Sequence, residues 1–177
     1  MKKILKKALL MTLFVGSLGF AQSSFDKFED KEDVTTVIVN KKMFEMMGKV
    51  KVETKDAETQ QYLNLLKKLD NLKVFTTSNN KMANEMKNTV SSYLKANPLE
   101  ELMRVNNEGK NVKIYVKSGA NENMVKELLM FIEGANIKEA STVILSLTGN
   151  FSLDEISMLT DKMKLPGADD LKKASKK

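Results

Sequence analysis

Residues 111–117, Asn-Val-Lys-Ile-Tyr-Val-Lys, carry a branched apolar side chain at every second position, so that these side chains share one face. Residues 125–133 contain the run Leu-Leu-Met-Phe-Ile, which is apolar on both faces, and residues 141–148 place branched side chains on both faces. Alternation with a period of two, in runs bounded by Gly and Asn, is typical of antiparallel strands. We therefore expect these three runs to be strands of an antiparallel sheet, around which the rest of the chain is organised.

More strands are predicted on the N-terminal side of this stretch. Runs rich in β-branched residues indicate strands at 34–39 and 72–77, and a turn at Asp70-Asn71 is expected to precede the second of them. Residues 100–105 predict another strand, which the turn at 106–109 folds onto the strand ending at residue 117.

Helices are indicated where apolar side chains recur at a spacing of three and four residues. They are expected near Phe25 and Phe28, over 41–47, from Asp56, from Ser78 or Asn79 to residue 97, and from Ser152 to the Pro-Gly pair at 166–167. Ser152 and Glu155 occupy the two ends of a capping box, which fixes the start of the last helix. The predicted fold is α+β: one mostly antiparallel sheet of about five to six strands, with helices packed on one face.

The first 21 residues are expected to be a signal peptide. Lys2, Lys3, Lys6 and Lys7 precede an apolar run, and small residues lead to a cleavage position before Gln22. A short membrane anchor is the alternative, but the apolar run is too short to span a bilayer comfortably. Residues 22–164 are expected to form a single domain and residues 165–177 a flexible lysine-rich tail. The chain is thus predicted to be exported to the periplasm or beyond the cell.

The composition limits the chemistry that the chain can perform. It contains no Cys, His or Trp, so no thiolate nucleophile, imidazole base or common zinc site can be built from it. Four of the 29 basic residues lie in the leader, which leaves 25 against 23 acidic residues, and the tail holds four more lysines. The body is therefore nearly neutral, and nucleic acid is not an expected partner.

Methionine is unusually frequent. Ten of the twelve lie after the leader: Met43, Met46, Met47, Met82, Met86, Met103, Met124, Met130, Met158 and Met163. Thioethers are soft ligands for Cu(I), so a soft-metal or small-ligand binder is one interpretation. The other is that these residues fill the core, because they fall on the predicted apolar faces. We favour the core, and predict no cofactor and no metal.

Four stretches of the second half form a recognisable set: Leu-Glu-Glu-Leu-Met-Arg-Val at 99–105, the strand at 111–116, Lys-Glu-Leu-Leu at 126–129, and Ser-Leu-Thr-Gly-Asn-Phe at 146–151. On these motifs the chain resembles the domain-of-unknown-function family four-two-five-two of exported Bacteroidota proteins, and the resemblance covers most of the chain after the leader. It implies no catalytic or binding residues. Some members are lipoproteins, which this chain without Cys cannot be, and gene neighbours in the family imply a role in an envelope response.

Three functions follow as hypotheses. The first is a non-enzymatic envelope protein that binds another envelope protein through an open sheet edge or an uncovered sheet face. Lys113, Tyr115 and Lys117, on the polar side of their strand, are its candidate contact residues. The second is the Met-based ligand binder. The third is an enzyme that works with carboxylates and lysine, which would need a pocket where such groups converge. Oligomeric state and strand order cannot be derived from the sequence.

Overall fold

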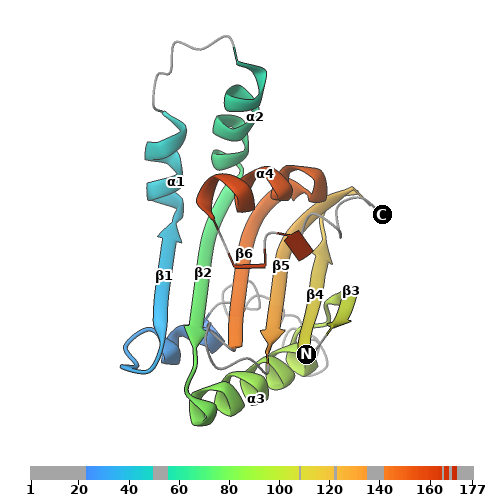
Figure 1. Cartoon of the computed structure of the whole chain (residues 1–177). Helices are drawn as coiled ribbons and strands as arrows, with labels where there is room; N and C mark the ends of the chain where they lie inside the picture. Colours follow the sequence, from blue (N-terminus) through green and yellow to red (C-terminus); the bar gives the residue numbers. More distant parts are fainter. Residues whose placement is uncertain are drawn as a thin grey trace, which may run out of the picture.

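Six strands form one sheet within the residues that the computed structural model describes, in the order β1-β2-β6-β5-β4-β3 (Figure 1). The structure describes residues 23–49, 56–107, 109–121, 123–134, 142–164, 166–167 and 169–170. Every neighbouring pair is antiparallel. The strands are β1 (Thr35–Asn40), β2 (Leu69–Thr77), β3 (Glu100–Asn107), β4 (Lys110–Ser118), β5 (Met124–Glu133) and β6 (Thr142–Ser152). The predicted α+β class, the antiparallel sheet and its strand number are thus confirmed.

The middle of the sheet is apolar on both faces. Successive side chains of a strand point to opposite faces, so β5 places Leu128, Met130 and Ile132 in one buried cluster and Leu129 and Phe131 in another. Exposing one of these apolar side chains to water would cost about 2 kcal/mol relative to burying it. Each face of the sheet therefore needs its own cover.

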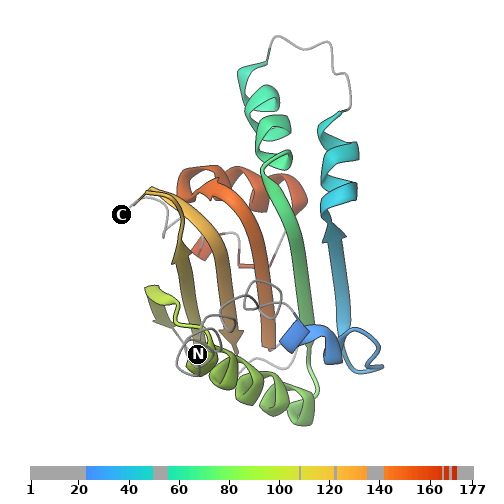
Figure 2. The ribbon, with the colours of Figure 1, turned by 180° about the vertical axis from the view of Figure 1, so that it is seen from behind.

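The prediction that the helices pack on one face is wrong for this reason. On the first face, α2 (Ala57–Leu66) and α4 (Leu153–Met163) contribute buried leucine and isoleucine side chains to the larger cluster. On the other face, the 3-10 helix η1 (Ser23–Phe28) and α3 (Asn80–Ala96) bury Phe25, Phe28 and Tyr93. Figure 1 looks onto the side of α4, and Figure 2 looks onto the side of η1.

The first two strands continue into a pair of helices. β1 runs directly into α1 (Lys41–Gly48), and two residues separate the end of α2 from the start of β2. The side chain of Asn40 caps α1 by accepting from the Met43 N–H at 3.0 Å, and Asp56 caps α2. Figures 1 and 2 show the two helices side by side, beyond the ends of β1 and β2.

Two element boundaries differ from the prediction. Asp70 and Asn71 do not form a turn but lie within β2, next to a bulge in its pairing with β6. β6 continues to Ser152, past the predicted end at residue 148. β2 is extended by its pairing with β6 up to Gly149, and the end of β6 is extended by the pairing of Phe151 and Ser152 with β5. In both places pairing with a neighbouring strand outweighs the local turn preference.

Near the C-terminus the chain remains in contact with the sheet. Asp170 is buried and pairs with Lys110 Nζ of β4 at 2.8 Å, although the sequence predicts a flexible tail from residue 165. The predicted leader, residues 1–21, lies outside the described residues. Among the residues that are described, no helix is long and apolar enough to cross a membrane.

Candidate contact surface

The three predicted contact residues share one face of β4. Lys113, Tyr115 and Lys117 point away from the buried side chains of that strand, toward the face covered by η1 and α3. Lys117 is exposed, Lys113 is half-buried, and Tyr115 packs against the smaller apolar cluster. The structure brings them together as alternate residues of one strand.

Tyr115 belongs to a polar network with the outer strand β3. The strand register places Glu101 opposite Tyr115 and Arg104 opposite Lys113. Arg104 donates to both carboxylate oxygens of Glu101, at 3.0 and 2.6 Å. Burial and the negative charge of Glu101 raise the pKa of Tyr115, so its phenol stays protonated in neutral solution. A role for these residues in binding stays a prediction.

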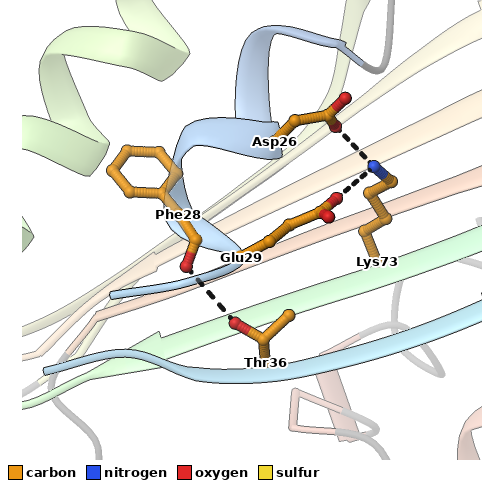
Figure 3. Close-up of polar contacts among 5 residues, drawn as sticks. All are labelled: Asp26, Phe28, Glu29, Thr36 and Lys73. Atoms are coloured by element: carbon orange, nitrogen blue, oxygen red, sulfur yellow. Dashed lines mark hydrogen bonds and ion pairs between the residues drawn. The ribbon is translucent and has the colours of Figure 1, made fainter. Parts of the chain in front are cut away.

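Lys73 of β2 is a buried cation held by two carboxylates near the N-terminal end of the described chain (Figure 3). Its Nζ pairs with Asp26 and lies 2.6 Å from Glu29, and the Thr36 hydroxyl donates to the Phe28 carbonyl beside it. Burial lowers the pKa of Lys73, but the two hydrogen-bonded carboxylates outweigh it and raise the pKa above its ordinary value. The lysine is therefore held charged, which suits the attachment of η1 to the sheet and not a nucleophilic amine.

A second buried polar contact attaches α3. The Tyr93 hydroxyl donates to the Glu127 carboxylate of β5, and both side chains are buried. Burial, followed by this hydrogen bond, raises the pKa of Tyr93. Within the described part of the chain, the contact consists of this one hydrogen bond between a single donor and a single acceptor. Among the described residues no cluster of three or more acidic, His or Cys side chains is placed to hold a metal ion.

An open groove runs between η1 and α3. It is lined mainly by polar side chains, including Asn88 and Ser92, and the Lys27–Glu85 ion pair at 3.5 Å joins its two walls. The pair and the open shape leave these charged groups in contact with water, where an ion pair contributes little.

The two edges of the sheet differ in how they are protected. β3, at one edge, carries the charged residues Glu100, Glu101 and Arg104 and has a bulge in its pairing with β4. Charges and bulges are the usual protection of a strand edge. β1, at the other edge, is Thr-Thr-Val-Ile-Val-Asn and pairs regularly with β2 on its inner side. Val37 and Ile38 are 45% and 43% exposed on its two faces.

The helix that follows β1 extends this apolar surface. Met43 and Met46 of α1 are 51% and 58% exposed, whereas Met86 and Met130 are fully buried. The prediction that methionines fill the core is therefore confirmed for Met86 and Met130 and wrong for Met43 and Met46. The cause is the position of α1, which stands beyond the end of the sheet and buries Phe44 and Gly48, with Met47 partly buried beside them. We call Val37, Ile38, Met43 and Met46 the β1–α1 surface.

Sequence analysis identifies the strand but not its exposure. A run of β-branched residues is equally typical of a buried central strand, and strand order depends on which segments pair. The signal present in the sequence is indirect: residues 35–39 contain no charge or proline, the features that commonly protect an edge.

Comparison with known proteins identifies the family. The model described as Domain of unknown function (DUF4252) matches residues 28–159, three quarters of the chain, and the chain therefore belongs to this family. The match begins at the last residue of η1 and ends within α4, so it includes the whole six-stranded sheet. No curated protein and no solved structure matches the chain.

Proposed function

We propose that this member of the DUF4252 family is an exported, non-enzymatic envelope protein that acts by contact with another protein chain. The observation that carries the proposal is the β1 edge, a regular strand that pairs with β2 on its inner side and with no other strand among the residues that the structure describes. Such an edge binds an added strand by main-chain hydrogen bonds, while the side chains on either face provide selectivity. The exposed methionines extend the surface along α1.

The chemistry of the side chains supports contact better than catalysis. The contacts of buried ionisable side chains each join a neighbouring segment to the sheet: Lys73 with the more exposed Asp26 and Glu29, Tyr93 with Glu127, and Asp170 with Lys110. The apolar residues of the β1–α1 surface, in contrast, belong to neither buried cluster and remain exposed to solvent. Exposed apolar side chains gathered along an edge strand and the helix that follows it suit contact with a partner.

Site-specific photo-crosslinking tests the proposal. A photoreactive amino acid is placed at Val37, at Met46 or, as a control, at Lys95, which is exposed on the opposite side of the α3 helix axis from its buried stripe. Irradiation of intact cells is expected to give a discrete adduct from the first two positions and none from Lys95. Equal labelling from all three positions, or none, would contradict a contact role for this surface.

The export part of the proposal has its own measurement. Cell fractionation followed by N-terminal sequencing is expected to find the protein outside the cytoplasm, starting at Gln22. An intact leader on a cytosolic protein would refute it, independently of the crosslinking result.

Soft-metal binding is the second candidate, favoured by the exposure of Met43 and Met46 one helical turn apart. Titration of Cu(I) into the purified protein and into the Met43→Leu/Met46→Leu variant separates it from protein contact. Binding tighter than about 1 μM that the double substitution abolishes would support the metal function. Equal, weak binding by both proteins would exclude it.

A further inference from the structure

The β1 edge is complementary to itself. When two copies of one strand pair in an antiparallel way about a two-fold axis normal to the sheet, one residue must lie opposite its own copy. We propose, building on the contact function of this surface, that the partner is a second copy of the chain, with β1 paired to β1 and Val37 opposite Val37. The two sheets then form one continuous twelve-stranded sheet.

The apolar pattern of β1 favours this register. With Val37 at the axis, Thr36 lies opposite Ile38 and Thr35 lies opposite Val39, so all five inner positions are β-branched pairs on matching faces. Shifting the axis by one residue toward the N-terminus places Asp33 opposite Val39. Shifting it toward the C-terminus places Thr35 opposite Lys41. Both shifts set a charge against an uncharged strand residue.

The charges that flank β1 select the same register. An acidic turn, residues 29–33, precedes the strand, and Lys41 and Lys42 begin α1 directly after it. With Val37 at the axis, the acidic turn of each copy comes alongside the first turn of α1 of the other. In Figure 1 this turn projects outward past the free edge, at the end of β1 opposite to α1.

Glu32 and Lys42 are the charges available for this contact. Lys41 already pairs with Asp70 at 2.8 Å, and Asp33 accepts from the Asn79 side chain. Glu32 and Lys42 are exposed, and neither is part of an ion pair among the described residues. The symmetric dimer contains the Glu32–Lys42 contact twice, so the same two residues complete both ends of the interface.

Disulfide trapping tests the register. The chain has no Cys, so Val37→Cys introduces one thiol at the axis. Opposed residues of antiparallel strands have Cα atoms about 5 Å apart, within the range of a disulfide. Thr35→Cys is the matched control, because its two copies would lie four residues, about 13 Å, apart along the strands. Mild oxidation of the purified protein is expected to give a covalent dimer with Val37→Cys only. Equal yields from both variants would overturn the register.

Charge reversal tests the partner. Glu32→Lys and Lys42→Glu are each expected to weaken self-association about tenfold, because each places like charges together at two points of the interface. A mixture of the two variant chains is expected to recover the affinity, since every reversed charge then meets its opposite. Sedimentation of the two variants alone and mixed measures this. No recovery in the mixture would overturn the proposal.

The outcomes separate this inference from the function on which it rests. A protein that sediments as a monomer up to about 100 μM, yet forms crosslinks from Val37 to a different chain in cells, overturns the second copy as partner and leaves the contact function standing. A monomer that gives no crosslink overturns both. Crosslinks whose mass is twice that of the chain, together with a sedimenting dimer, support both.

Discussion

Lys73 and its two carboxylates differ in how well water can reach them. The Lys73 side chain is 9% exposed, whereas those of Asp26 and Glu29 are 49% and 31% exposed. Removing the carboxylate charges would leave the buried lysine charge unpaired. Removing the lysine would leave two carboxylates that water can solvate. The energetic cost of breaking this cluster should therefore depend on which side is removed.

Urea unfolding measures that asymmetry. The double substitution Asp26→Asn/Glu29→Gln is expected to lower the free energy of unfolding by about 2–3 kcal/mol, and Lys73→Met by about 1 kcal/mol. Lys27→Met, which breaks the exposed pair with Glu85, serves as the control and should cost no more than about 0.5 kcal/mol. A cost for Lys73→Met equal to that of the double substitution would show that the lysine is not the group that depends on its partners.

Ser146 is a buried hydroxyl with an unmet hydrogen bond. It is 1% exposed, and its Oγ has no hydrogen-bond partner among the described residues. Ser146→Ala removes the unpaired group and is expected to raise the free energy of unfolding by about 1 kcal/mol. Thr89→Val is the matched control, because that buried hydroxyl donates to the Glu85 carbonyl at 2.7 Å, and its removal should lower stability. Thermal unfolding that ranks the two variants the other way would contradict this account of Ser146.

At the scale of elements, Glu155 joins the start of α4 to the end of α2. Its carboxylate accepts from the Ser152 N–H at 2.9 Å and pairs with Lys68 at 2.5 Å. The first contact is one of the two bonds of the capping box that the sequence predicts, and the Ser152 hydroxyl also donates to the same carboxylate at 3.3 Å. Burial raises the pKa of Glu155, but the contacts with Lys68 and Ser152 outweigh it, and the net effect is a lowered pKa. The contribution of Glu155 is therefore present above the pKa of the unfolded chain and is lost as the pH falls below it.

Glu155→Ala is expected to lower the free energy of unfolding by about 1–2 kcal/mol at pH 7. The deficit relative to the unsubstituted protein should shrink between about pH 5 and pH 3, because protonation removes the same contacts. Asp154→Ala, at the exposed neighbouring position, is the control and should change stability by less than about 0.5 kcal/mol. A deficit that does not vary with pH would show that the charge of Glu155 is not the stabilising feature.

The sequence predicts best those elements whose ends are marked by local capping residues. Asn79 and Asp56 cap the helices that they were expected to begin, and Ser152 and Glu155 form the expected contact. The continuation of β2 through Asp70 and Asn71 was not predicted, because those two residues favour turns locally and pairing with β6 and β1 keeps this part of the strand extended. Local chemistry thus determines where helices start, while distant partners determine where strands end.

At the scale of the whole molecule, the sequence predicts the fold class but not the strand order or which faces of the sheet the helices cover. The alternating apolar runs predict one antiparallel sheet, and the same runs, apolar on both faces, require cover on both sides. The position of β1 at the edge follows from the strand order, which no local pattern records. For this reason the candidate residues Lys113, Tyr115 and Lys117 could be assigned to one face from the sequence, whereas the exposure of Val37 and Met46 could not.

The packing of η1 and α3 on their face of the sheet should be sensitive to alkaline pH. Tyr93 attaches α3 to the sheet and Lys73 attaches η1, and the pKa of each is raised in the folded protein, that of Tyr93 by burial and its bond to Glu127. A raised pKa gives stability that is complete below the pKa of the unfolded chain and is lost as the pH rises above it. For tyrosine and lysine those unfolded values lie near 10 and 10.4. Both attachments should therefore weaken in the same pH range.

The free energy of unfolding is accordingly expected to be nearly constant from pH 7 to about pH 9.5 and to fall above about pH 10, by up to about 1.4 kcal/mol per pH unit for each group. Tyr93→Phe should lower stability at neutral pH, because Glu127 loses its donor, and should also reduce the alkaline slope by one group. Urea unfolding between pH 8 and pH 11 compares the slopes directly, with Tyr62→Phe, on the opposite face, as the comparison variant. Burial also raises the pKa of Tyr62, but without a carboxylate partner, so this substitution should reduce the slope less than Tyr93→Phe does. Equal slopes for the unsubstituted protein and Tyr93→Phe would show that the attachment of α3 does not depend on the protonated phenol.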